Sequence, residues 1–133
     1  MHGKSEWFSQ QLSELPGFLG ALTHVLEHRL VDLDPWELFT SDGPMKVRSE
    51  AVNRRYPQRV VLRFARRRDT DDVACLVLSS SMKEKPGDVL VVHDFAKPGF
   101  EVDTEFPDFW DWFRVAVEDM IETFRHVGDY REG

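Results

Sequence analysis

The sequence contains very little cysteine, no low-complexity tract and no repeat with a period of tens of residues. The single cysteine, Cys75, excludes a disulfide framework within one molecule of this 133-residue chain. Cys75 lies inside an apolar run, which favours a buried, inert thiol over a nucleophile. A reducing compartment fits this composition best, and a disulfide-stapled scaffold is excluded.

Long apolar runs are also missing. No window approaches the ~20 consecutive apolar residues that a membrane-spanning helix needs. The N-terminus has no basic region followed by an apolar stretch, so it lacks the pattern of a secretory signal peptide. We therefore expect a cytoplasmic protein that does not associate with a membrane.

Catalytic motifs such as G-x-S-x-G, a glycine-rich nucleotide loop or a Cys/His zinc spacing are absent. Residues 24–28 match the H-x-x-E-H pattern of inverted zincins, in which two histidines on one helix face bind zinc. Such enzymes need a third ligand on a separate helix, and two solvent-facing histidines arise easily by chance. The sequence therefore predicts no catalytic residue, no metal site and no cofactor, and leaves open whether His24 and His28 bind a metal adventitiously.

Two further polar strings have structural explanations. Asp69 to Asp72 resembles the aspartate pairs of phosphotransferases, but three arginines precede it, which favours a charged hairpin turn with local neutralisation. His93 and Asp94 are neighbours at a strand end, and adjacent strand residues point to opposite faces, so they are badly placed to form a dyad. We expect His93 to be buried or half-buried and hydrogen-bonded.

Size and charge indicate one acidic globular domain over residues 1–133, with 41% hydrophobic and 31% charged residues. The net charge of −7 is unevenly distributed. Residues 1–68 hold 11 Lys/Arg against 8 Asp/Glu, a net of +3, whereas residues 69–133 hold 6 against 16, a net of −10. The second half should repel nucleic acid and attract basic surfaces, unless its acids serve only solubility.

Seven arginines between Arg54 and Arg68 raise nucleic acid as an alternative partner, because phosphate neutralisation drives such binding. They are spread over a strand and a turn, and several have aspartates as neighbours. Nucleic acid is therefore the less favoured partner.

The first half of the chain predicts helices followed by weaker patterns. Ser5 can cap a short helix that ends at Leu15, and Pro16 suits the first turn of a second, amphipathic helix extending to Leu30. Residues 34–39 are expected to form a capped single turn that offers Trp36 and Phe39 to the core. Residues 41–44 are expected to form a turn, and residues 45–58 a short strand around Val47 followed by an irregular connection.

The second half predicts strands and one long helix. We expect residues 59–65 and 73–78 to form an antiparallel hairpin. Residues 73–78 and residues 89–92 are each apolar on both faces, so we expect both to be central strands of the sheet. In residues 100–106 apolar side chains alternate with Glu101, Asp103 and Glu105, which predicts a strand with an acidic outer edge.

A helix is expected from about Pro107 to Gly128. Its predicted apolar stripe consists of Phe109, Trp110, Phe113, Ala116, Val117, Met120, Ile121 and Phe124. Trp112 lies roughly 100° from the centre of this stripe at about 3.6 residues per turn, which suggests a partly exposed residue, either at an interface or in flanking core packing.

Three blocks in this order, Phe64 to Leu78, Gly87 to Phe95 and Phe106 to Phe113 with its helix, resemble the SUKH superfamily (Smi/Knr-type domains). The resemblance covers roughly residues 60–124 and rests on fold-determining residues. It implies an α+β fold in which a central, mainly antiparallel sheet of about four to six strands packs against N-terminal helices and a long C-terminal amphipathic helix.

The resemblance further implies a non-enzymatic immunity protein that neutralises a toxin domain, often a nuclease, by direct binding. The alternatives are a regulatory interaction module without a toxin partner and a small hydrolase. Candidate partner-binding residues are Asp71, Asp72, Glu101, Asp103, Glu105, Asp108, Asp111 and Trp112. Reversing the charges of Glu101, Asp103 and Glu105 together is expected to slow association and leave folding intact.

Overall fold

The structure, a computed structural model, describes residues 7–132 and the side-chain environments of residues 7–125. The helices in this part of the chain are α1 (Trp7–Gln11), α2 (Pro16–Glu27), α3 (Asp42–Arg55) and α4 (Phe109–Glu132). The strands are β1 (Asp32–Leu33), β2 (Trp36–Leu38), β3 (Arg59–Arg67), β4 (Asp72–Ser80), β5 (Val89–His93) and β6 (Val102–Phe106). The expected cap at Ser5 lies outside the described residues.

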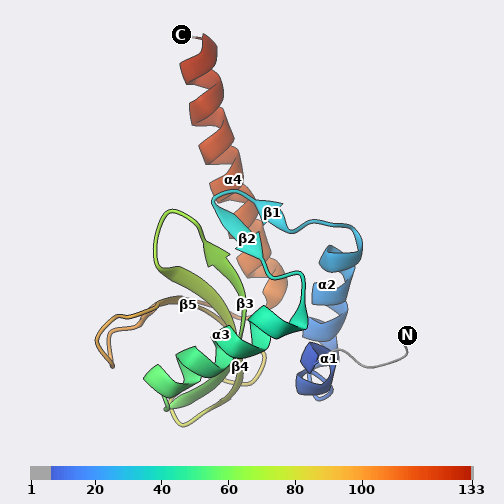
Figure 1. Cartoon of the computed structure of the whole chain (residues 1–133), viewed down its shortest axis with the longest axis vertical. Helices are drawn as coiled ribbons and strands as arrows, with labels where there is room; N and C mark the ends of the chain where they lie inside the picture. The colour runs from blue at the N-terminus through green and yellow to red at the C-terminus, as the bar shows by residue number, and fades with distance from the viewer. Residues whose placement is uncertain (1–6, 133) are drawn as a thin grey trace.

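The six strands form one antiparallel sheet in the order β1-β2-β3-β4-β5-β6, so every strand pairs with its sequence neighbours (Figure 1). The α+β class and the antiparallel sheet predicted from the sequence are confirmed. None of the described helices is both long enough and apolar enough to cross a bilayer.

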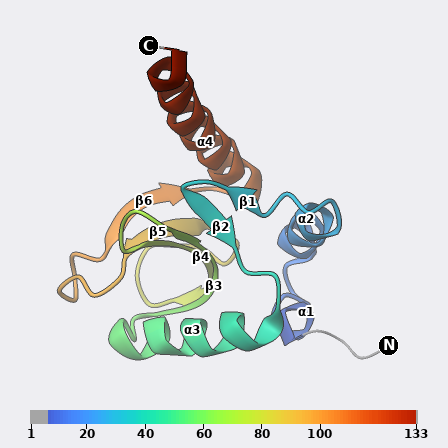
Figure 2. The same ribbon diagram turned by 45° about the horizontal axis from the view of Figure 1, so that its top comes forward.

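Helices cover both faces of this sheet (Figure 2). Leu62 and Phe64 on β3 pack into a large cluster with α2 and the first half of α4, whereas Val61 packs into a smaller cluster with Val52 and Tyr56 at the end of α3. This alternation follows from the two-residue side-chain period of a strand. Strands β4 and β5 are therefore apolar on both sides, as the sequence indicates, whereas β3 also carries Arg59 and Arg63.

Helix α3 replaces the turn and the short strand that were expected over residues 41–58, so this prediction is wrong. The helix buries Met45, Ser49 and Val52, a set too mixed to produce an apolar stripe. Its remaining contacts are polar: Ser49 Oγ accepts a hydrogen bond from the backbone amide of Arg63 at 2.8 Å. Asn53 likewise bonds both the N–H and the C=O of Val61, at 2.8 and 3.2 Å.

These bonds are needed because β2 has only three residues and pairs with β3 only from Ala65 to Arg67. The first half of β3 has no strand on that side, and its backbone groups need other partners. The α3 side chains supply them, so helix α3 docks through hydrogen bonds that hydrophobic periodicity does not reveal.

The segment 34–39 also differs from the prediction of a single helical turn. Residues 36–38 form strand β2, whose burial alternates from buried Trp36 through Glu37 to buried Leu38. The chain reverses between Leu33 and Trp36, which pair across the β1–β2 hairpin. Trp36 still reaches the core, as expected, but from a strand.

Trp112 lies at the centre of an aromatic cluster and is only 1% exposed, so its prediction as a partly exposed interface residue is wrong. Its ring meets those of Trp36 and Phe64 edge to face, at centroid distances of 5.4 and 5.0 Å. Trp110, placed on the predicted stripe, is instead 44% exposed. The first turn of α4 is aromatic on nearly every side, so its contacts with β2 and β3 select the buried face.

The distal part of α4 also departs from the prediction. Ile121 and Phe124, assigned to the apolar stripe, are 44% and 59% exposed, because the helix extends beyond the body of the protein (Figure 1). The helix continues through Gly128 to Glu132 rather than ending at the glycine.

Replacing Trp112 by alanine should lower the free energy of unfolding by about 3–5 kcal/mol, the usual cost of truncating a fully buried tryptophan. Trp110→Ala, two residues away, is the matched control and should cost less than half as much because Trp110 is exposed. Urea denaturation followed by circular dichroism measures both. Equal losses would show that the burial of Trp112 is wrongly assigned.

Candidate functional site

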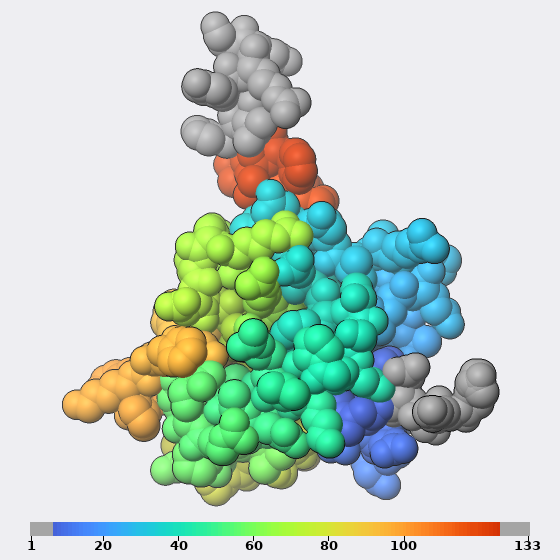
Figure 3. Space-filling view, in the orientation of Figure 1, coloured from blue at the N-terminus to red at the C-terminus, as the bar shows by residue number. Residues whose placement is uncertain are grey.

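The connection between β5 and β6, here called the β5–β6 loop (residues 94–101), projects from the body of the protein (Figure 3). Two phenylalanines in it, Phe95 and Phe100, are each 72% exposed. These are the most exposed large apolar side chains in residues 7–125. Exposed aromatic residues of this kind are typical of binding surfaces.

Asp94 anchors the first residue of this loop. Its carboxylate is buried and accepts hydrogen bonds from Nε and Nη2 of Arg55 on α3, at 2.8 and 2.5 Å. Nη1 of Arg63 on β3 lies 3.6 Å away. The guanidinium of Arg55 also lies 4.3 Å from the ring centroid of Phe95, so the same arginine supports the exposed phenylalanine.

Glu101 anchors the other end of the loop. Its carboxylate accepts hydrogen bonds from Arg59 Nη1 at 2.9 Å and from the backbone amide of Gly99 at 2.6 Å. Arg59 also donates to both carboxylate oxygens of Glu84, at 2.7 and 2.9 Å. This donation is the main reason why the pKa of Glu84 falls to about 2.

Backbone atoms of the loop are held as well. The hydroxyl of Tyr56 donates to the carbonyl of Ala96 at 2.7 Å, and the His93 amide donates to the Glu101 carbonyl at 2.7 Å. Burial raises the pKa of Tyr56, which keeps its hydroxyl protonated as a donor. The exposed phenylalanines thus sit on a loop whose base is fixed by α3 and β3.

Glu101 is therefore not a surface carboxylate, and its prediction as a partner-binding residue is wrong. It is 5% exposed. Glu101 precedes β6, which begins at Val102, and its carboxylate is bonded to Arg59 instead of facing solvent. Within β6 the alternation is also broken: Val91 pairs with Thr104 but Val92 pairs with Val102, which leaves Asp103 as an extra residue. Reversing the charge of Glu101 would remove its bond to Arg59, so we now expect the triple reversal to disturb the fold as well as the surface.

The other predicted acids separate into two groups. Asp103 and Glu105 are exposed on β6, an edge strand, and Asp71 is exposed in the β3–β4 turn beside the base of the loop. We call Asp71, Asp103 and Glu105 the acidic edge. Glu105 lies 3.3 Å from Lys83, an exposed pair that contributes little stability.

Asp108 and Asp111 belong instead to the start of α4. Oδ1 of Asp108 accepts a hydrogen bond from the backbone amide of Asp111 at 2.8 Å, which caps the helix. Both lie beyond the far end of β6 from the loop. Their role in the structure is local, and the structure does not bring them together with Asp71.

His93 and Asp94 point to different partners, as the strand geometry predicts. The half-exposed imidazole of His93 contacts the carboxylate of Asp72 through Nδ1 and lies 3.6 Å from Asp103 through Nε2. Asp94 points toward Arg55. The pair does not form a dyad, and the largely buried side chain of Asp72 lies against His93.

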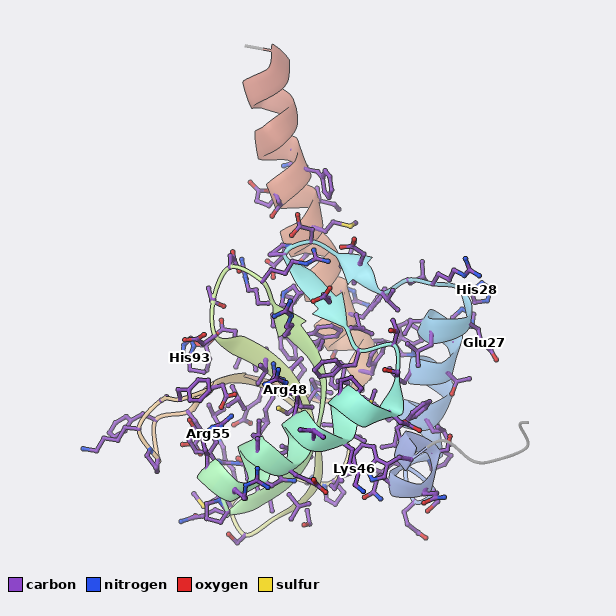
Figure 4. The ribbon with its side chains drawn as sticks, in the orientation of Figure 1. Glu27, His28, Lys46, Arg48, Arg55 and His93 are labelled. Carbon is purple, nitrogen blue, oxygen red and sulfur yellow. The ribbon has the colours of Figure 1, made fainter. Side chains whose placement is uncertain are left out.

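An open cavity of about 670 Å³ lies beside the base of the loop, between α3, β2, β3 and the β3–β4 turn. Six arginines line it: Arg48, Arg55, Arg63, Arg66, Arg67 and Arg68. In Figure 4, Arg48 and Arg55 rise from α3 toward the β3–β4 hairpin, and His93 lies beyond them. Arg48 was missed from the sequence, although its spacing of seven residues from Arg55 indicates one face of a helix.

The outer arginines of the cavity are neutralised by carboxylates. Nε of Arg66 donates to Glu37 at 2.7 Å, and this bond lowers the pKa of Glu37. Arg68 lies between Asp32 and Glu37, at 3.0 and 3.2 Å. Arg67 pairs with Asp69 at 2.7 Å. The predicted neutralisation of this turn is confirmed, and it leaves little net charge there for nucleic acid.

The inner arginine, Arg63, is different. It is 9% exposed, and burial lowers its pKa. Its guanidinium lies 5.5 Å from the ring centroid of Phe39, and its Nε has no acceptor within the described part of the chain. A buried charged donor without an acceptor is costly and calls for an explanation.

Cys75 and the two histidines of α2 are the remaining chemical candidates. Cys75 is fully buried, and burial raises the pKa of its thiol to about 12, so it is an inert thiol as predicted. The rings of His24 and His28 lie 4.3 Å apart on the exposed side of α2. Across residues 7–125, no group of three or more potential metal ligands comes together.

Comparison with known proteins gave no match: no family profile, no curated protein and no solved structure is significantly similar to this chain.

The Arg59–Glu84 pair predicts a specific pH dependence. Because the pKa of Glu84 is about 2 in the folded protein against an ordinary value of 4.5, the unfolded chain binds more protons between these values. The contribution of the pair, on the order of 3 kcal/mol, is fully present above about pH 5 and is lost as the pH falls toward 2.

Chemical denaturation at several pH values between about 6 and about 2 measures the unfolding free energy across this range. Glu84→Gln should lower the unfolding free energy at neutral pH and flatten its decline in acid. Glu50→Gln, which removes an exposed carboxyl from α3, is the control. Parallel pH profiles for the wild type and Glu84→Gln would contradict the role of this ion pair.

Proposed function

We propose that this chain is a non-enzymatic protein-binding module that neutralises a basic toxin domain by direct binding, as an immunity protein of the bacterial cytoplasm does. The observation that carries the proposal is the anchored β5–β6 loop, which exposes Phe95 and Phe100 beside the acidic edge. The resemblance of residues 60–124 to the SUKH superfamily supports the same proposal.

The anchored loop favours tight binding because it is already ordered in the free protein, so binding costs little conformational entropy. Asp94 and Glu101 fix its two ends through arginines of α3 and β3. Each phenylalanine can then bury its ring in a partner without a large loss of loop entropy. Aromatic residues at the centre of an interface commonly carry most of its binding energy.

The charges around the loop favour a basic partner. Asp71 and Asp103 are exposed near its base, Glu105 lies further along β6, and the chain as a whole carries a net charge of −7. Complementary charge accelerates the encounter of two proteins and weakens as salt is added. A toxin domain that handles nucleic acid tends to be basic and fits this requirement.

A regulatory module without a toxin partner would use the same surface. The two readings differ in what the partner does: a toxin stops growth unless this chain is present, whereas a regulatory partner is tolerated without it. Expressing the product of the neighbouring reading frame with and without this chain separates them.

The double variant Phe95→Ala/Phe100→Ala should lose the partner. Each truncation of an aromatic anchor costs about 2 kcal/mol or more, so the dissociation constant should rise at least about 100-fold and co-expression should no longer restore growth. The partner captured by the wild type supplies the ligand, and calorimetry supplies the affinities.

Val47→Ala is the control for this experiment, because it removes an apolar side chain that is 61% exposed on α3, outside the loop. It should bind like the wild type. Undiminished binding by the phenylalanine variant, or an equal loss in Val47→Ala, would refute the loop as the binding surface.

Reversing two charges of the acidic edge, Asp103→Lys with Glu105→Lys, should lower the association rate constant about tenfold or more at low salt. The dissociation rate should change less, and the difference from the wild type should shrink as salt is added. Stopped-flow or surface plasmon resonance measures both rates. Glu101 is left intact so that the loop remains anchored, and a salt-independent effect would contradict steering.

A further inference from the structure

The cavity of about 670 Å³ lined by six arginines, here called the arginine cavity, has an excess of positive charge on its α3 side. Arg48, Arg55 and Arg63 line its α3 side, and one buried carboxylate, Asp94, lies against Arg55 and Arg63. Arg48 and Arg55 lie close enough to Arg63 to lower its pKa by repulsion, in addition to the larger effect of burial. On this side of the cavity, three cations against one anion leave a local surplus of two positive charges, whereas Asp71 and Asp72 line the opposite side.

The side chain of Arg63 is also short of hydrogen-bond acceptors. Its closest carboxylate oxygen, Asp94 Oδ2, is 3.6 Å from Nη1, beyond the range of a good hydrogen bond. Arg55 occupies both oxygens of that carboxylate with its own fork. Within the described residues, Nε of Arg63 is a buried nitrogen without any partner. An anion bound to the terminal nitrogens of Arg63 would explain why this guanidinium is buried here.

From this geometry we infer that the inner part of the arginine cavity binds a small ligand through a phosphate group. A dianionic phosphate matches the surplus of two charges, and its oxygens suit the paired donors of guanidinium groups. The site adjoins the proposed protein-binding surface, because Phe95 and Asp71 also line the cavity, but its charged residues Arg48 and Arg63 are not part of that surface.

The walls of the cavity define where this group lies. Arg66 and Arg68 on the outer side are already engaged by Glu37, so they offer little to a ligand. Asp71 and Asp72 line the cavity opposite α3 and would repel an anion, and Asp72 is in contact with His93. The phosphate therefore lies on the α3 side, against Arg48 and Arg63.

The volume of about 670 Å³ leaves room for more than a phosphate. Cavities of roughly 300–1,000 Å³ usually hold small organic ligands. Phe39 and Phe95 line the same space and offer aromatic surface to an organic part. Organic phosphates of mononucleotide size should therefore bind more tightly than inorganic phosphate.

Isothermal titration calorimetry with inorganic phosphate, adenosine 5′-monophosphate and uncharged adenosine tests the site on the full chain. Both phosphates should bind and adenosine should not. Tighter binding of the nucleotide identifies an organic phosphate as the ligand class, whereas equal affinities identify the free phosphate ion.

Arg48→Gln removes one cation from the cavity, and its exposed position on α3 lets the protein fold. It should weaken phosphate binding about tenfold or more, as expected for the loss of one charge-assisted hydrogen bond. Arg54→Gln, on the same helix but outside the cavity lining, has the same change in net charge and should bind like the wild type.

The side chain of Arg63 provides a second measurement that needs no substitution. Its Nε–H is shielded from solvent, and its nitrogen NMR signal should shift on addition of phosphate in the wild type and move less in Arg48→Gln at the same concentration. Absence of binding, equal losses in Arg48→Gln and Arg54→Gln, or a stationary Arg63 signal would each overturn the inference.

Discussion

Two buried carboxylates, Asp94 and Glu101, determine how the exposed parts of this protein are presented. Each stands at one end of the β5–β6 loop, and each is neutralised by arginines that come from α3 or β3. A buried carboxylate without its partner is strongly unfavourable, so the loop, the helix and the strand are stable only when they are assembled together. The position of the loop is consequently a property of the whole α3 side of the sheet.

Much of the fold could be predicted from the sequence, because apolar periodicity records burial. Strands β4 and β5 are apolar on both faces, and the predicted limits of β3, β4 and β5 are nearly correct. Helix α3 could not be found this way, since Ser49 and Asn53 dock it through hydrogen bonds to the backbone of β3. Trp112 was misplaced for the opposite reason: the start of α4 is aromatic all round, and only its tertiary partners select a buried side.

The candidate site was predictable only in part. Exposed Asp103 and Glu105 follow from simple alternation, but Glu101 lies in the loop before β6, where Arg59 and the Gly99 amide hold its carboxylate in the interior. The sequence shows the arginines as a run. It does not show that the outer arginines are neutralised and the inner one is unsatisfied, because this depends on distances that no sequence pattern contains. Phe95 and Phe100 became candidates only when their exposure and the anchoring of their loop were known.

The free edge of β6 has a consequence for association between copies of this chain. An edge strand exposes backbone donors and acceptors that any other strand could pair with, including the same strand of a second molecule. In such a pairing the carboxylates of Asp103 and Glu105 would lie close to those of the second copy, and like charges placed opposite each other are repulsive. The carboxylates at this edge therefore disfavour pairing with a like-charged strand and favour pairing with a strand of opposite charge.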